Sequence, residues 1–389
     1  MLDSTGLFVL NLLASLAPFL IVTVSLNLEY GYAGIPNFGK TLAVAGGAFV
    51  AGVIPGRFLA FLFGIGKNLS YIDDNKQIVS AINRQLVTDP VLSIGIIILT
   101  LIMAVLIGAL LGLLIAYPVA RLRTDYLGMT FLAFGQVILV IGNNFPPLVG
   151  GTLGVSVPDP FAFVSVYSIF DLLPGEMRNL FVITFMSIVA LLVFLFARRL
   201  TRSPLGRVLR AIRDDENSAL ALGKDVQRNR IIIMIFSSAI AALAGALYAM
   251  YTANVFSTTY SRTTWTFWPW VMVILGGAAN DLGIVSGTFI FVAVRQIISY
   301  YREFFEPILP FNIVWLDTLL LGLALLFILI YRPEGLIREK PIKTIKIESL
   351  SVEESKKASI KQTSGFREEL KKIIETLLKL PKKKETEEI

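Results

Sequence analysis

Long apolar runs separated by short polar or glycine-rich stretches dominate the sequence. A helix needs about 20 apolar residues to cross the hydrocarbon core of a bilayer. Such runs occupy residues 7–26, 41–63, 91–119, 180–197, 231–250 and 313–331, and a shorter one at 127–141 ends before Asn143-Asn144. Two more stretches, 268–277 and 283–298, are each short for a full crossing and predict a broken hairpin around residues 278–282. The pattern predicts an all-α polytopic transmembrane helical bundle of eight or nine segments, with short and broken helices around a central pathway.

Composition narrows the class of protein. Hydrophobic residues make up 55% of the 389-residue chain, the mean hydropathy is +0.72, and 16% of residues are charged, whereas soluble domains carry about a quarter. The net charge of +7 does not indicate nucleic-acid binding, because the basic residues lie beside the apolar runs or in the tail. The absence of cysteine and histidine excludes thiol nucleophiles, imidazole bases and the usual zinc or haem ligands, so no metal site is expected.

A polar stretch at residues 198–230 lies between two strongly apolar runs. Ser203 and Pro204 are typical of an N-cap and a first helical position, because the serine oxygen accepts an orphan N–H and proline has none to satisfy. Asp214-Asp215-Glu216 is expected to cap a second short helix at 216–222, which Gly223 ends. Within the first helix, apolar residues recur at helical spacing and basic residues lie on the other side: Leu205, Val208, Leu209 and Ile212 against Arg207, Arg210 and Arg213.

Two interpretations of residues 198–230 are open. Arginines after a span are commonly topology signals, because basic residues mark cytoplasmic loops. That explains Arg198, Arg199 and Arg202, but it explains neither the caps nor the amphipathic face. The pattern therefore favours two short helices at a bend, which form a docking surface on the cytoplasmic side.

Residues 203–223 resemble the cytoplasmic coupling loop of the branched-chain amino acid ABC transporter permeases, M-type subunit. In that family the loop inserts into a cleft on a separate ATPase subunit. The resemblance implies that Glu216, Ala219 and Gly223 occupy the Glu-Ala…Gly pattern of importer permeases, although Asn217-Ser218 stand where small residues are common. The residues predicted to couple to the ATPase are Arg207, Arg210, Arg213, Asp214, Glu216, Ala219 and Gly223.

Four further stretches resemble the same family. Residues 31–39 are similar to its signature after an early span, but Pro36-Asn37 and Lys40 depart from the Ser-Leu-Gly, followed by His or Gln, that members more often carry. Residues 121–154 resemble the family's central run, 275–287 its late glycine-rich turn, and 332–336 its terminal Arg-Pro-Glu-Gly-Leu box. These marks cover most of the chain, and the coupling loop and the terminal box are the most specific of them.

Polar and glycine residues within or beside the spans are candidates for the translocation pathway. An amide inside a bilayer is costly unless it bonds another helix or faces water, and bonding another helix is the commoner case. A zwitterionic amino acid needs donors and acceptors, which broken-helix ends near residues 31–34 and 276–280 could supply. The candidate pathway residues are Tyr32, Gly34, Asn37, Gln136, Asn143, Asn144, Gly276, Gly277 and Asn280.

Residues 34–41 match the nucleotide-binding pattern G-x-x-x-x-G-K-[ST] letter for letter. A P-loop follows a strand of a soluble α/β sheet and precedes a helix whose N-terminus faces the phosphates. Here the motif lies between two predicted spans, and no stretch of the chain alternates strands with soluble helices. The match is therefore rejected. No cofactor is expected on this chain, and ATP is expected on a partner subunit.

Basic residues set the expected topology. With residues 198–230 on the cytoplasmic side, the chain is a multi-pass protein of the plasma membrane with its N-terminus outside and its C-terminus in the cytoplasm. Met1-Leu2-Asp3 lacks the basic start of a signal peptide, so the first apolar run is expected to stay as a span. We expect a permease domain at 1–336 and a charged tail at 337–389. An amphipathic helix at 366–380 in that tail suits a membrane surface or a partner; a solvated tail is the alternative.

The resemblance implies the membrane subunit of an ABC importer for branched-chain or related hydrophobic amino acids. Its partners would be ATPase subunits, a second homologous permease or a second copy of the chain, an extracytoplasmic binding protein and the lipid membrane, with no nucleic acid and no enzymatic activity of its own. Permeases for urea, short amides or sugars are alternatives. An ion-coupled secondary transporter is another, but it needs intramembrane charges, and the acidic candidates, Glu29 and Asp317, both lie near span ends. A membrane enzyme would need paired carboxylates, which no predicted span presents.

Overall fold

The computed structural model describes residues 4–65, 69–119, 122, 124–166, 173–302, 319, 322–323, 326–328, 330–332 and 334–339. Within these ranges seven helices are long and apolar enough to cross a membrane. They are α1 (Ser4–Asn27), α2 (Lys40–Leu62), α4 (Pro90–Val119), α5 (Thr124–Asn144), α7 (Pro174–Arg202), α10 (Val226–Thr252) and α12 (Asp281–Tyr300). Each coincides with a predicted apolar stretch, and the all-α bundle is confirmed. The prediction that 127–141 and 283–298 are short is wrong, because α5 has 21 residues and α12 has 20, enough to cross a membrane.

Several predictions fall outside the described residues. They include most of the span predicted at 313–331 with Asp317, the arginines Arg121 and Arg123, and the whole tail from residue 340 with its expected amphipathic helix at 366–380. The total of eight or nine segments and the boundary of the tail therefore stay predictions.

Short elements connect the long helices. The polar segment predicted between the second and third spans contains a helix, α3 (Asn75–Thr88), which buries Ile78, Ile82 and Leu86. After α5 come α6 (Pro146–Val149) and β1 (Val155–Ser156), which pairs antiparallel with β2 (Asn254–Val255). Turns of 3-10 helix at Ala162–Val166 and Ser257–Tyr260 and a π-helical turn at Thr263–Phe267 complete these connections. The predicted broken hairpin is confirmed as α11 (Trp268–Gly276) packed against α12.

The core of the bundle lies around α2 and α10. In their spanning windows 78% and 67% of residues are buried, against 28% for α4 and 33% for α7. The two central helices approach closely through glycine: a Cβ added at Gly47 would lie 1.9 Å from the carbonyl oxygen of Ala242, and one at Gly245 would lie 1.8 Å from that of Val44. Small residues along both helices permit this approach.

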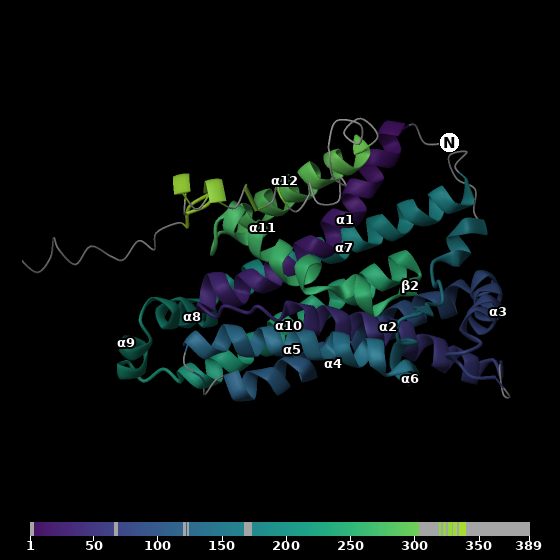
Figure 1. Cartoon of the computed structure of the whole chain (residues 1–389), viewed down its shortest axis with the longest axis horizontal. Helices are drawn as coiled ribbons and strands as arrows, with labels where there is room; N and C mark the ends of the chain where they lie inside the picture. Colours follow the sequence, from purple (N-terminus) through teal and green to yellow (C-terminus); the bar gives the residue numbers. More distant parts are fainter. Residues whose placement is uncertain are drawn as a thin grey trace, which may run out of the picture. The chain divides into compact units, whose positions relative to one another are not determined.

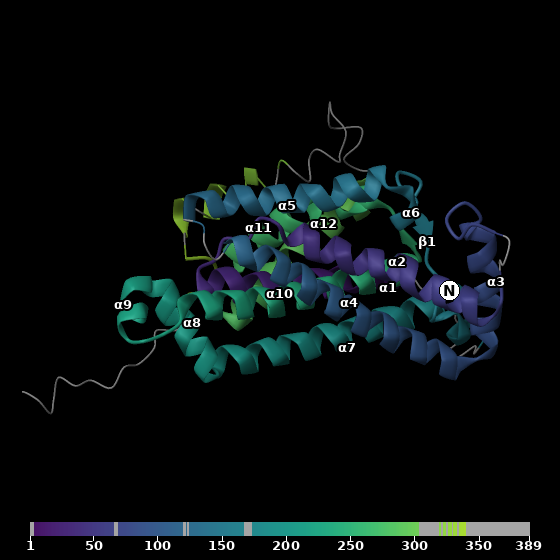
Figure 2. The same ribbon diagram turned by 90° about the horizontal axis from the view of Figure 1, so that it is seen from below.

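The remaining helices surround this centre, and different short elements lie at its two ends. α8 (Pro204–Asp214) and α9 (Glu216–Ala221) lie together at one end, while α3, α6 and the β1–β2 pair lie at the other (Figure 1). Seen from below, α5 and α7 run along opposite edges of the bundle (Figure 2). The predicted coupling helices therefore lie at the end opposite the β1–β2 pair.

The chain stays helical beyond the end of α1, but with a different hydrogen-bonding pattern. α1 runs into a π-helical turn at Leu28–Tyr32, and residues 34–39 then form an irregular stretch before α2 begins at Lys40. The rejected nucleotide-binding pattern consists of this stretch and the first two residues of α2. A helical turn precedes it where a P-loop needs a strand, and the strands in the described ranges are two residues long.

Candidate coupling surface and its link to the membrane helices

The first coupling helix, α8, begins at the predicted residue. Ser203 occupies the N-cap and Pro204 the first helical position. The expectation that the Ser203 hydroxyl caps the helix is wrong, because this hydroxyl donates to the carbonyl oxygen of Leu200 at 2.6 Å, in the last turn of α7. Ser203 has an extended backbone, with φ −75° and ψ 171°, between the end of α7 and the start of α8. Leu209 and Ile212 are buried on the predicted apolar face.

The second coupling helix, α9, is capped as predicted. The Asp215 carboxylate accepts from the backbone N–H of Asn217 at 3.0 Å and from the Ser218 hydroxyl at 2.6 Å, and these hydrogen bonds lower the pKa of Asp215. Ala219 is buried in a small cluster with Ile212 and Val226, which fixes α9 against α8 and the start of α10. Gly223 has φ 73° and ends the helix in the left-handed region.

Two leucines are exposed in α9 and at its C-cap. Leu220 is 51% exposed and Leu222 is 75% exposed, beside the exposed polar residues at the start of the helix. Arg207 and Asp214 are also exposed, and Glu216 is held by two hydrogen bonds from Arg230, at 2.9 and 3.1 Å. The exposed leucines and these charged residues form a compact protruding surface. We call it the coupling surface, and it consists of Arg207, Asp214, Glu216, Leu220, Leu222 and Gly223. Adjacent exposed apolar side chains of this kind are typical of a protein contact.

Two of the predicted coupling arginines reach into the permease body, although Arg213 also donates to Asp214 of the coupling surface at 3.0 Å. Arg213 donates to the carbonyl oxygen of Gly31 at 2.6 Å, and its guanidinium pairs with Glu339 at 3.0 Å. Burial lowers the pKa of Arg213, but hydrogen bonds and charge from Glu339 and Asp214 outweigh burial and hold that pKa above its ordinary value. Arg210 lies over the ring of Tyr32, 5.0 Å from its centroid. Both arginines therefore join α8 to the break after α1.

The break after α1 is also joined to the α11–α12 hairpin. The Tyr32 hydroxyl donates to Asp281 at 3.0 Å, and Arg198 lies 3.9 Å from the other oxygen of the same carboxylate. Asn27 accepts from the backbone N–H of Ala279 at 2.9 Å. We call these joined residues the hub: Asn27, Gly31, Tyr32, Arg198, Arg210, Arg213, Asp281 and Glu339. It connects the coupling helices with two broken points in the membrane helices.

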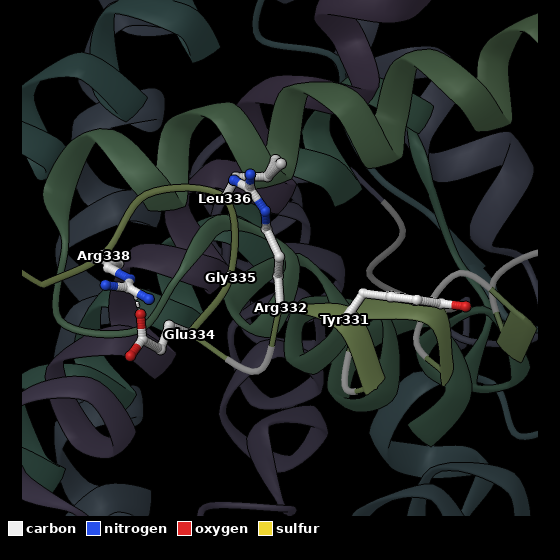
Figure 3. A pocket seen from close by; sticks show the side chains of 6 residues that line it. All are labelled: Tyr331, Arg332, Glu334, Gly335, Leu336 and Arg338. Carbon is white, nitrogen blue, oxygen red and sulfur yellow. Dashed lines mark ion pairs between the residues drawn. The ribbon is translucent and has the colours of Figure 1, made fainter.

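The terminal box docks on the same hairpin. The backbone N–H groups of Leu336 and Ile337 donate to the carbonyl oxygens of Leu275 and Gly276, at 2.9 and 3.1 Å. Gly277, with φ 101°, leaves no room for a side chain, since an added Cβ would lie 2.3 Å from the Ile337 carbonyl oxygen. A pocket of about 430 Å³ lies beside the box, and Figure 3 shows Glu334 and Arg338 pointing toward one another at its rim.

The predicted pathway residues do not gather at one place. Tyr32, Gly34, Gly276, Gly277 and Asn280 lie around the hub, where Asn280 caps α12 and donates to the carbonyl oxygen of Arg338. Other candidates lie on α5, with Gln136 near its middle and Asn143 and Asn144 at its end. The Asn37 side chain accepts from the Gly39 N–H at 2.7 Å and so shapes the irregular stretch. A pathway role for these residues stays a prediction.

A buried ion pair lies at the break after α1. The Lys40 ammonium is 2.9 Å from a carboxylate oxygen of Glu29, and both side chains are 0% exposed. Lys40 also donates to the Ser237 hydroxyl, which in turn donates to the carbonyl oxygen of Ser25. The lysine of the rejected nucleotide-binding pattern is therefore occupied within the bundle. In the described residues no group of three or more acidic side chains could hold a metal ion.

Comparison with known proteins places the chain in a family. A family model described as the permease component of branched-chain amino acid transport systems matches residues 8–329. The chain belongs to this permease family. A probable branched-chain amino acid transport permease protein LivM from Methanocaldococcus jannaschii is 42% identical to the permease over 328 residues, which cover 84% of this chain and 92% of that relative.

Two bacterial relatives are more distant. High-affinity branched-chain amino acid transport system permease proteins LivM from Salmonella typhimurium and Escherichia coli are each 29% identical over 60% of the permease, and the matches cover 56% and 55% of their lengths. No solved structure matches the permease.

Sequence reasoning predicted the two short helices of residues 203–223 but not the contacts that connect them to the membrane helices. Their coupling role stays a prediction. Nothing in the spacing indicated that Arg213 faces Gly31, or that Lys40 pairs with Glu29, because both contacts depend on how α1 breaks. The departure at Lys40 from the usual His or Gln was the one available signal for the ion pair. Leu220 and Leu222 were visible as apolar residues in a polar loop, which is the pattern of a contact surface.

Proposed function

We propose that this permease is a membrane subunit of an ABC importer that carries branched-chain or related hydrophobic amino acids into the cell. An extracytoplasmic binding protein delivers the substrate, a second permease subunit completes the pathway, and a separate ATPase supplies the energy. The names of the relatives support the substrate class. The permease itself carries out no reaction and holds no cofactor, since ATP binds to the partner.

The observation that carries this proposal is the coupling surface. α8 and α9 pack against α7 and α10 and lie together at one end of the bundle (Figure 1). Their outer side exposes Leu220 and Leu222, which gain nothing from water and are too few to bind a bilayer. A complementary apolar cleft on a soluble subunit suits them, and docking there places the ATPase in the cytoplasm.

The hub supplies a route for movement from the coupling surface to the membrane helices. A displacement of α8 by the ATPase moves Arg213, which bonds the Gly31 carbonyl in the π-helical turn after α1. Gly34 lies beside this contact with φ 69°, a conformation that other residues rarely adopt, and an added Cβ would lie 3.0 Å from Arg213 Cγ. Tyr32 and Asp281 then connect the turn to α12. Coupling through such packed, hydrogen-bonded elements needs no deformation of the helices themselves.

The topology that goes with this function places the coupling surface in the cytoplasm. The end that carries α3 and the β1–β2 pair then faces outside, together with the start of α1, which lies at that end (Figure 1). The terminal box docks beside the hub, so the tail that follows it starts on the cytoplasmic side. The substrate pathway connects the two ends.

Introducing charge at the two exposed leucines tests the docking proposal. Replacing Leu220→Glu together with Leu222→Glu places two charges where an apolar cleft is expected, so the ATPase should no longer co-purify with the permease complex. Leu153→Glu is the matched control, because Leu153 is 86% exposed at the opposite end of the protein. Size-exclusion profiles confirm that both variants fold. Normal co-purification of the double variant would contradict the proposal.

A further inference from the structure

We infer that one exposed face of α5 is the seam at which a second permease subunit packs, and that the substrate pathway runs along this seam. The α5 face consists of Met129, Ala133, Gln136, Val137, Val140 and Asn144. The inference rests on the proposed function and adds to it by naming the helix and the side chains that meet the second permease.

α5 is as exposed as α4 and α7, but it is much less apolar than either. In the spanning windows of α4, α5 and α7, 28%, 28% and 33% of residues are buried, so all three helices expose most of their surface. The mean hydropathy of these windows is 3.0 for α4 and 2.9 for α7, but 1.5 for α5. A helix that is mostly surrounded by lipid is expected to be strongly apolar. α5 has the exposure of a lipid-facing helix and half the hydropathy.

Gln136 is the residue that lipid would tolerate least. It lies near the middle of α5, at the depth of the hydrocarbon core, and its side chain is exposed. Its amide has no hydrogen-bond partner among the described residues. The middle of the exposed face of α4, by contrast, is aliphatic: Ile98, Ile102, Leu106 and Leu110. An unpaired amide in lipid is costly, so the α5 face must meet another protein surface or water.

The polar character continues along the same face. Asn144 lies two helical turns beyond Gln136 and is exposed, and the neighbouring Asn143 has a buried side-chain oxygen without a hydrogen-bond partner. The opposite face of α5 is already packed, since Phe131 is fully buried and Gly135 lies against Gly39 at the start of α2. Asn144 donates to the carbonyl oxygen of Val140, so the free polar side chain on this exposed face, among the described residues, is that of Gln136.

The occupant of the seam must itself span the membrane. Neither a cytoplasmic ATPase nor an extracytoplasmic binding protein reaches the middle of a bilayer, whereas a second permease subunit does. α7, on the opposite edge of the bundle, exposes Ile188, Leu191 and Leu192 and is suited to lipid (Figure 2). A seam with amides on its walls also offers the donors and acceptors that a zwitterionic substrate needs.

Site-directed photo-crosslinking of the assembled importer tests this inference. The chain contains no cysteine, so single cysteines can be introduced and modified with a benzophenone maleimide. The test variants are Ala133→Cys, Val137→Cys and Val140→Cys on α5. The matched controls are Ile98→Cys and Leu106→Cys on α4 and Ile188→Cys on α7. After irradiation in membranes, mass spectrometry identifies the adduct at each site.

We expect the α5 sites to form adducts with the second permease subunit, and the α4 and α7 sites to form adducts with lipid. Lipid adducts from all three α5 sites, or permease adducts from α4 or α7 with none from α5, would overturn the inference. If such a result comes from complexes that still contain the ATPase, the proposed importer function stands and only the seam is wrong. Failure of the ATPase to co-purify with the unmodified permease would instead contradict the proposed function.

Water access gives a second measurement. Gln136→Cys is expected to react with a membrane-impermeant thiol reagent at least as fast with ATP present as without it, and faster than Ile102→Cys in either condition. Equal, slow reaction of both variants would contradict a pathway along the α5 face.

Discussion

At the scale of single residues, Arg213 connects more of the proposed mechanism than any other side chain in the described residues. It lies on the coupling helix, bonds the π-helical turn after α1 and pairs with Glu339 after the terminal box. A guanidinium can make both contacts at once because it carries several N–H donors in a fixed planar arrangement. Its inward orientation separates the role of Arg213 from that of Leu220 and Leu222, which face the partner.

Arg213→Ala is expected to separate ATP hydrolysis from transport. The ATPase should still co-purify, because the coupling surface is unchanged, but amino acid uptake per ATP hydrolysed should fall about tenfold or more, as a charge-assisted hydrogen bond is worth about 1.5–3 kcal/mol. Arg338→Ala is the matched control, because Arg338 makes an exposed ion pair with Glu334 and such pairs contribute little. Uptake and ATP hydrolysis measured together in vesicles check this; an unchanged ratio would exclude a coupling role for Arg213.

The Glu29–Lys40 pair leads to a prediction about stability. Removing one partner leaves a buried charge without compensation, which costs about 3–5 kcal/mol, whereas removing both is far less costly. We therefore expect Glu29→Gln and Lys40→Met each to lower the melting temperature of the detergent-purified permease. The double variant should melt nearer to the unmodified protein than either single variant. Additive losses in the double variant would show that the two groups do not interact.

At the scale of elements, the bundle is organised by the close contact of α2 and α10. Glycine at 47 and 245 brings the two backbones together, and the remaining spans pack around this pair. In a bilayer, an apolar side chain gains little by leaving lipid for another helix. Helices are therefore held together by close packing of small residues. The broken points of α1 and of the α11–α12 hairpin lie at one end of this rigid centre, beside the coupling helices.

Gly47→Leu should destabilise the bundle strongly. Its side chain would meet the backbone of Ala242, which cannot move aside without separating α2 from α10, and overpacking of a core typically costs about 1–3 kcal/mol. Gly95→Leu is the control, since a Cβ at Gly95 on α4 has no atom within 4 Å. Thermal melting in detergent should show a large loss for the first variant and little for the second. Similar stability of both would mean that the α2–α10 contact is not central.

At the scale of the whole molecule, the sequence predicted the spans, the hairpin and the coupling loop because each depends on local spacing of apolar, capping and basic residues. It did not predict α3, although Ile78, Ile82 and Leu86 recur at helical spacing there, because the segment is too polar for a span and only the apolar runs in that part of the chain were assigned to helices. The site could be predicted only in part. Glu216 begins α9 and Gly223 follows it with φ 73°, as the local pattern predicts, and their coupling role stays a prediction. The contacts of Arg210, Arg213 and Asn280 depend on tertiary packing that no local pattern contains.

The central claim is that energy for transport enters this permease from a separate subunit through α8 and α9. Reconstitution in vesicles tests it most directly. The purified importer is compared with the permease alone, with radiolabelled leucine as substrate and ATP on the cytoplasmic side. We predict uptake that requires the ATPase, ATP and the binding protein, with none from the permease alone. Leucine uptake by the permease alone, or stoichiometric nucleotide binding to it, would contradict the claim.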